Sequence, residues 1–154
     1  MNDIERLLND LKKVDPKIRK QATQSLWMRW YQECGEAAER KLYAGIRFMD
    51  LGELSRARLH FADLVDQFPE YTEAHNKLAT VLYLEGNYEA AIAECRKVVE
   101  RIPHHFGAWN GMGMCLFHLG RLNEAIHSFQ KALEIQPYAE DNRHYIGLCR
   151  GKLN

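Results

Sequence analysis

The sequence predicts an all-α protein of antiparallel helix pairs that recur every 34 residues, about nine helices in total. Three sets of residues share this spacing: Pro69, Pro103 and Pro137; Gly52, Gly86 and Gly120; Ala57, Ala91 and Ala125. A fixed period of this length is typical of repeat proteins, in which each unit packs only on its neighbours. The helices are considered below in chain order.

Residues 1–37 lie outside the repeat register, and they predict a hairpin of two helices. The first helix has an apolar stripe that includes Ile4 and Leu7. The second begins at Asp15-Pro16, because an aspartate N-cap followed by a first-turn proline favours a helix start. We expect this hairpin to cap the repeat stack, and the alternative is a separate docking surface.

Aromatic residues gather on one stripe of the second predicted helix, at Trp27, Trp30 and Tyr31, together with Cys34. We expect this stripe to pack against the first repeat. The alternative is an exposed patch that binds a partner.

Three units follow, at 38–71, 72–105 and 106–139, and each predicts a helix, a short turn and a second helix. Apolar residues recur three and four positions apart in the first helices. The repeated glycine ends that helix, because glycine readily adopts the left-handed conformation of a C-cap. The repeated alanine lets two helices approach closely, and the repeated proline stops the second helix.

Residues 140–154 restart the repeat, since Ile146-Gly147 lies 34 residues after Met112-Gly113. No second helix follows this segment. It predicts a closing helix that places Tyr145, Ile146 and Cys149 against the third unit.

The repeat unit resembles the tetratricopeptide repeat (TPR), a 34-residue helix–turn–helix. The large–small pairs Leu78-Ala79 and Met112-Gly113 and the aromatic residue Trp109 carry this resemblance. It implies a right-handed α-solenoid with a concave wall. The amino-terminal segment is similar to a HEAT-type helical hairpin through Asp15, Pro16, Arg19, Ala22 and Leu26.

The resemblance implies that the first helix of each unit lines a groove. The groove-facing places of the family fall on Leu42, Ile46, Met49, Asn76, Thr80, Tyr83, Asn110, Met114, Phe117 and His144. The same register adds Asp50, Leu84, His118, Asp141 and Leu148. We expect Asn76 and Asn110 to hold a peptide backbone while apolar residues contact its side chains. The alternative is that these asparagines only join neighbouring helices.

Co-chaperone TPR domains hold acidic carboxyl-terminal peptides with a clamp of lysine and asparagine side chains. The corresponding places in the first unit are Leu42 and Ile46, which cannot bind a carboxylate. Lys77 and the two asparagines keep only part of the pattern. The sequence therefore disfavours a chaperone tail as the ligand.

Composition and motifs argue against other function classes. The chain has 21 basic and 21 acidic residues, so it has no net field for nucleic acid, and no apolar run is long enough to cross a bilayer. No catalytic or nucleotide-binding motif is present, so we expect no enzyme activity and no cofactor. We expect His104-His105 to face solvent in a turn and to bind no metal.

The leading functional hypothesis is a non-enzymatic adaptor or scaffold that binds a peptide or helical segment of another protein. One alternative is a homo-oligomeric structural or assembly factor that self-associates through the aromatic hairpin. Another is a regulatory subunit that senses a small molecule. Four scattered cysteines without a CxxC motif, and an amino terminus without a signal-peptide core, indicate a reducing, cytoplasmic location.

Overall fold

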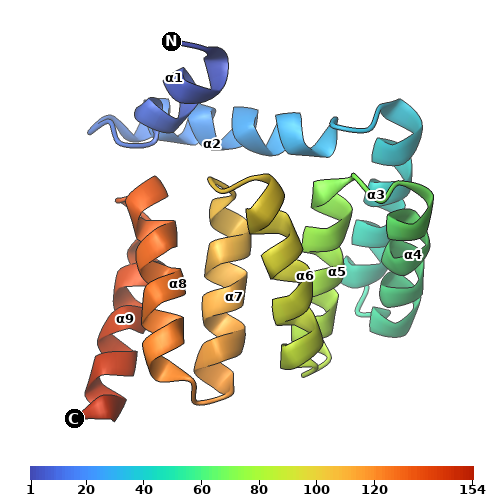
Figure 1. Ribbon diagram of the computed structural model, residues 1–154. Coiled ribbons are helices and arrows are strands. Elements are labelled where there is room, and N and C mark those ends of the chain that lie inside the picture. The colour runs from blue at the N-terminus through green and yellow to red at the C-terminus, as the bar shows by residue number, and fades with distance from the viewer.

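The computed structural model describes residues 1–154 and contains nine α-helices and no strands. The helices stand side by side in chain order from α3 onward, and α2 runs along this row across the helix ends on one side (Figure 1). The helices are α1 (Asp3–Asp10), α2 (Pro16–Tyr31), α3 (Glu36–Asp50), α4 (Leu54–Gln67), α5 (Thr72–Leu84), α6 (Tyr88–Arg101), α7 (Phe106–His118), α8 (Leu122–Ile135) and α9 (Glu140–Leu153). The predicted all-α solenoid of helix pairs is confirmed.

The repeated glycines end the first helix of each unit. Gly52, Gly86 and Gly120 have φ angles of 76°, 79° and 74°, a left-handed conformation that side chains other than glycine rarely adopt. The second helix of each unit then folds back against the first. The repeated alanines of α4, α6 and α8 are fully buried at these contacts.

A small residue in the first helix receives a large one from the second in units one and three. A Cβ atom added at Gly113 would lie 2.7 Å from the Phe129 ring, and the same collision arises between Gly45 and Phe61. Unit two uses the pair Ala79 and Cys95, which are both buried. Because these glycines have no side chain, the two helices of each pair can pack closely together.

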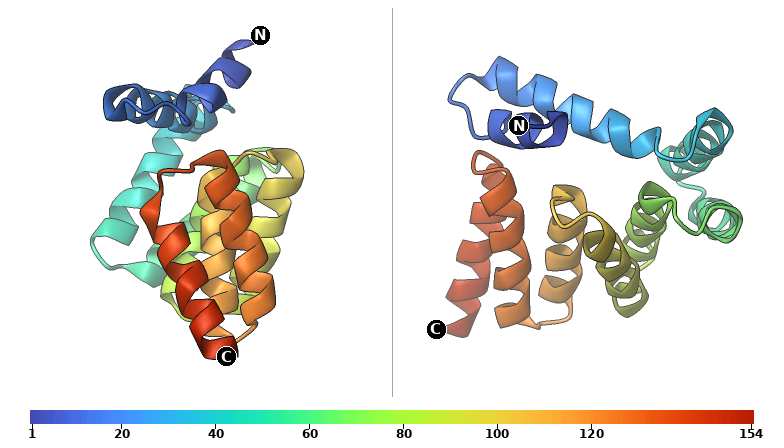
Figure 2. Two further views of the ribbon diagram at one scale, coloured as in Figure 1. Left: turned by 90° about the vertical axis from the view of Figure 1, so that its left-hand side faces the viewer. Right: turned by 45° about the horizontal axis from the view of Figure 1, so that its top comes forward.

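The hairpin of α1 and α2 does not continue the stack. Instead α2 lies across the ends of the repeat helices (Figures 1 and 2). Asp15 caps α2 as expected, because its carboxylate accepts a hydrogen bond from the Lys17 amide at 2.9 Å. Leu7, Leu11 and Leu26 form a second hydrophobic cluster that also contains Phe106 of α7.

Three successive junctions between units contact α2 in turn. Near its start, the Arg19 guanidinium lies 4.0 Å above the Tyr138 ring, in the turn between α8 and α9. In the last turn of α2, Trp30 stacks on His105, which lies in the turn between α6 and α7. At its end, the Tyr71 hydroxyl donates to the Tyr31 carbonyl, in the turn between α4 and α5.

The aromatic stripe of α2 is therefore placed differently from the expectation that it packs against the first repeat. Trp27 and Trp30 lie against His105 and Phe106, at the start of the third unit, and only Tyr31 reaches the first. The reason is the crossing direction of α2. A helix that runs along the row meets each unit at its end and not along one side.

Candidate functional site

A cleft of about 400 Å³ opens on the wall formed by the first helices of the repeats. Its floor is made by α5 and α7, with Cys95 of α6 behind them, and its sides are closed by Trp27 of α2 and by α9. The lining residues are Trp27, Asn76, Lys77, Ala79, Thr80, Tyr83, Cys95, Gly107, Asn110, Gly111, Met114, Cys115, Asp141 and Tyr145. We call this set the cleft.

Of the ten residues first assigned to the groove, five meet in the cleft: Asn76, Thr80, Tyr83, Asn110 and Met114. Asp141, which the same register added, lines it as well. The other five of the ten, Leu42, Ile46, Met49, Phe117 and His144, lie outside it. Phe117 and His144 are close by, because both pack edge-on against Tyr145, a lining residue.

Leu42 was predicted to face the groove, and this prediction is wrong. Its side chain is fully buried and belongs to the main hydrophobic cluster. Tyr31 and Cys34, at the end of the hairpin, pack against the same cluster. The first unit thus contributes its groove-side leucine to the core. Ile46 and Met49 are half-buried and also pack on this cluster.

The two equivalent asparagines each use one amide N–H within the chain. Asn76 donates to the Glu73 carboxylate at 2.7 Å, and Asn110 donates to the Asn142 side chain at 2.9 Å. The second bond joins α7 to α9. The side-chain oxygens (Oδ1) of Asn76 and Asn110 accept no hydrogen bond within the chain, so both amides keep an acceptor for a ligand.

Eight of the fourteen lining residues were absent from the predicted set, and three of these eight are Lys77, Gly107 and Trp27. The Lys77 ammonium lies 5.1 Å above both the Trp27 and Tyr31 rings, a cation–π arrangement. A Cβ atom added at Gly107 would lie 2.7 Å from the Trp27 ring. The repeat register could have revealed Gly107, because it stands at the second place of unit three, which is one of the groove-facing places of the family. Asp141 stands at the equivalent second place of the closing segment. No repeat signal could reveal Trp27, which lies outside the register.

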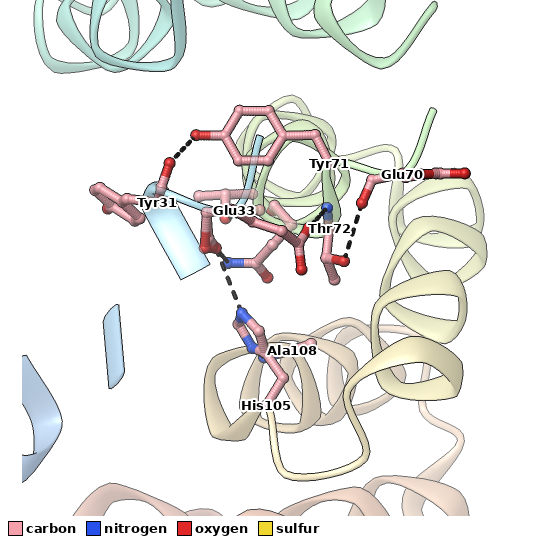
Figure 3. A network of polar contacts seen from close by, with 10 residues as sticks. Tyr31, Glu33, Glu70, Tyr71, Thr72, His105 and Ala108 are labelled. Atoms are coloured by element: carbon pink, nitrogen blue, oxygen red, sulfur yellow. Dashed lines mark hydrogen bonds and ion pairs between the residues drawn. The ribbon is translucent and has the colours of Figure 1, made fainter. Parts of the chain in front are cut away.

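A polar network holds the hairpin over the start of α5 and α7 (Figure 3). The Thr72 amide donates to the Glu33 carboxylate at 2.8 Å. Burial raises the pKa of Tyr71, whose hydroxyl donates to the carbonyl of Tyr31. These bonds satisfy backbone groups at the end of α2 and at the start of α5.

The expectation that His104-His105 faces solvent is wrong for His105, which has no exposed surface. It is the N-cap of α7, and its Nδ1 accepts a hydrogen bond from the Ala108 amide at 3.0 Å. Its Nε2 lies 3.4 Å from the carboxylate of Glu73, which is also fully buried. The burial follows from α2, because Trp30 covers the imidazole face.

The thiols beneath the cleft are held in their neutral form. Burial raises the pKa of Cys115 to about 11, and burial also raises the pKa of Cys95. All four cysteines are free. No three histidine, cysteine, aspartate or glutamate side chains gather where they could hold a metal ion. None of the helices combines the length and apolar character that a membrane span requires.

Family models described as tetratricopeptide repeat match residues 42–105 and 107–138. A TPR repeat-containing protein of Rhizobium etli is 26% identical over 132 residues, which are 86% of this chain and 58% of that relative. DnaJ homolog subfamily C member 3 of Bos taurus is 31% identical over 113 residues, which are 72% of this chain but 22% of the relative. The chain thus spans only part of each relative.

Solved structures with the same fold have low sequence identity to the chain. The first TPR of Spaghetti (RPAP3), bound to the HSP90 peptide SRMEEVD, has a TM-score of 0.74 at 18% identity and covers 75% of this chain and 92% of its own. The TPR2B domain of yeast Sti1 in complex with pHsp70 gives 0.71 at 15%, covering 75% and 97%. The MamA RS-1 ArsTM double mutant gives 0.72 at 21%, covering 100% and 87%.

Proposed function

Because this chain belongs to the tetratricopeptide-repeat family, we propose that its cleft binds a peptide or helical segment of another protein. In this proposal the protein is a non-enzymatic adaptor, located in a reducing, cytoplasmic compartment where its four cysteines stay free. One observation carries the proposal: an open cleft on the wall of first helices that combines apolar side chains with unused amide acceptors. That combination suits a segment which offers both side chains and backbone N–H groups.

The amides account for recognition of the backbone. Asn76 and Asn110 stand one repeat apart, and each is held in place by its bond to the chain. A side chain already fixed in this way loses little rotamer freedom when a ligand N–H approaches its carbonyl oxygen. The same bonds that join the helices therefore also prepare the amides for a ligand.

Apolar residues account for recognition of side chains. Tyr83, Met114 and Tyr145 line the cleft, and none of them is fully buried. Methionine and aromatic side chains provide large, adaptable contact areas. Two structural neighbours, the RPAP3 and Sti1 domains, are bound to chaperone peptides, which supports a protein segment as the class of ligand.

An acidic chaperone tail is not the ligand that we propose. Lys77 is the only cation in the lining, and the carboxylate of Asp141 also lines the cleft without pairing with Lys77, so the lining has no net positive charge. The first unit offers Leu42, which is buried, and Ile46 where a clamp needs polar groups. A peptide with several carboxylates would find one positive charge here.

The two alternatives have less support. Self-association through the aromatic hairpin would use Trp27 and Trp30, which already contact His105 and Phe106 of the same chain. A small-molecule sensor would need a more enclosed site than this open cleft.

Selection of a random dodecapeptide display library on the purified protein tests the proposal. We expect enriched peptides to bind the wild type and to lose at least about tenfold in affinity with Met114→Glu, because a charge would stand in an apolar contact. Ala93→Glu, an exposed change on α6 outside the cleft, is the matched control and should leave affinity unchanged. Failure to enrich any peptide, or equal losses in both variants, would contradict the proposal.

A further inference from the structure

Part of the cleft lies over α7 where this helix lacks side chains. Gly107 and Gly111 stand one turn apart on α7, and the equivalent places of α5, 34 residues earlier, carry Glu73 and Lys77. Both glycines line the cleft. The third unit therefore has no side chains at two places on α7 where the second unit has two long ones.

The two glycines differ in what occupies the space beside them. At Gly107 the Trp27 ring already fills it, since an added Cβ atom would lie 2.7 Å from that ring. At Gly111 the nearest neighbour is the Cys95 sulfur, 3.7 Å from an added Cβ atom, which is an ordinary contact distance. Only the space above Gly111 remains open for a ligand.

Four large apolar or aromatic side chains line the cleft with Gly111, namely Trp27, Tyr83, Met114 and Tyr145. The polar side chains of Asn76, Thr80 and Asn110 also line it. The floor is formed by the thiols of Cys95 and Cys115, which their raised pKa values keep uncharged. A floor and walls of this kind favour a bulky apolar side chain over a polar one.

The positive charge of Lys77 at the edge of the cleft indicates which ligand residue would lie next to the bulky apolar side chain. The ammonium of Lys77 is held over the Trp27 and Tyr31 rings, and it forms no ion pair with any carboxylate of the chain. It is also the only cation that lines the cleft. A carboxylate on the ligand would therefore find an unpaired, half-buried partner beside the Gly111 space.

We propose that the space above Gly111 receives one aromatic or leucine side chain of a partner protein segment, with a neighbouring aspartate or glutamate paired to Lys77. This inference rests on the proposed function, because it names the segment that the cleft would bind. It differs from a multi-carboxylate tail in requiring one bulky apolar residue and a single adjacent acid. The partner segment thus has an exposed apolar anchor with one acidic residue beside it.

The dodecapeptides enriched on the wild-type protein test this proposal through their consensus. We expect an aromatic residue or leucine next to aspartate or glutamate. Replacing the bulky residue by serine should weaken binding at least about tenfold, because the anchor contact is lost. Replacing the acid by its amide should weaken binding by about two- to fivefold for wild type and not at all for Lys77→Gln.

Variants at Gly111 give the decisive comparison. Gly111→Leu should fill the space and weaken peptide binding at least about tenfold, while Gly147→Leu, at an open glycine of α9, should change nothing. Gly111→Ala should weaken binding less and keep or raise the melting temperature, since alanine favours the helix. This second variant preserves the test if leucine impairs folding.

The outcomes separate this proposal from the broader one. Peptides that bind, lose affinity with Met114→Glu and ignore Gly111→Leu would leave the adaptor function standing and overturn the anchor. A consensus without a bulky residue would do the same. Binding of N-acetyl-phenylalanine amide as tightly as any peptide would also overturn the proposal, since the site would then be a small-molecule site.

Discussion

The indole of Trp30 stacks on the imidazole of His105, with ring centroids 4.1 Å apart and planes 20° from parallel. The two residues are far apart in the sequence, and the contact joins the amino-terminal hairpin to the junction between the second and third units. It covers a histidine whose Nδ1 caps α7. The hairpin thereby positions Trp27, the neighbour that forms one wall of the cleft.

Replacing Trp30 by alanine should destabilise the protein by about 3–5 kcal/mol, the range for deleting a large aromatic side chain from a core. Only 4% of the Trp30 side chain is exposed. Urea unfolding followed by circular dichroism measures the change. Met28→Ala, on the exposed side of α2, should cost less than about 0.5 kcal/mol. Equal losses in the two variants would mean that the hairpin contributes little through Trp30.

Gly113→Ala should destabilise the protein by about 1–3 kcal/mol, because the new methyl group would meet the buried Phe129 ring at 2.7 Å. The ring has no exposed surface and cannot move aside into solvent. Gly147→Ala is the matched control, since nothing lies within 4 Å of its added Cβ atom. That variant should gain up to about 1 kcal/mol from helix propensity. Thermal unfolding of both variants compares them directly, and a stable Gly113→Ala would contradict the packing described.

Lowering the pH should reduce the free energy of unfolding of the wild type more than that of Glu94→Gln. Burial alone would raise the pKa of Glu94, but hydrogen bonds from His75 and Lys97 outweigh it and lower the pKa below 4.5. A lowered folded-state pKa contributes stability that is present above the unfolded value and is lost as pH falls through the folded value.

Unfolding free energies measured from pH 7 to pH 3 check this expectation. The difference between wild type and Glu94→Gln should shrink as the pH falls below 4.5. Glu100→Gln, at an exposed position on the same helix, should follow the wild-type curve. Parallel curves for wild type and Glu94→Gln would show that this carboxylate is not linked to folding.

Alkylation should distinguish the four cysteines. With a pKa of about 11, Cys115 would hold roughly one thiolate in a thousand at pH 8, and Cys95 and Cys149 are also buried with raised pKa values. Burial also raises the pKa of Cys34, but its side chain is only half-buried, so iodoacetamide should modify native protein first at Cys34. Mass spectrometry counts the adducts, with Cys34→Ser and guanidinium-unfolded protein as controls. Rapid labelling of Cys95 or Cys115 in the native state would contradict the burial of the cleft floor.

Much of the fold could be predicted from the sequence because the same residue types recur at the same places in three units. The spacing of Gly52, Gly86 and Gly120 marks three turns that share one left-handed conformation. Asp15 and Pro16 likewise mark a helix start from local chemistry alone. These features depend on neighbours close in sequence, and the sequence contains all of the relevant information about them.

The site could be predicted less well, because its shape depends on a segment outside the repeat. The position of α2 follows from contacts such as Arg19 with Tyr138 and Trp30 with His105, which no periodicity links. The sequence alone therefore predicts that His105 faces solvent in a turn, because it does not show that α2 covers this residue. The family register also assigns Leu42 to the groove, whereas the end of the hairpin packs on the cluster that contains it.

Mapping of a bound peptide by nuclear magnetic resonance tests the central claim most directly. A ¹⁵N-labelled sample would be titrated with the tightest dodecapeptide from the selection. The account predicts that the largest amide shift changes fall in residues 76–83 and 107–114, on the first helices that form the cleft. Changes confined to α4, α6 and α8, with those two segments unmoved, would contradict it.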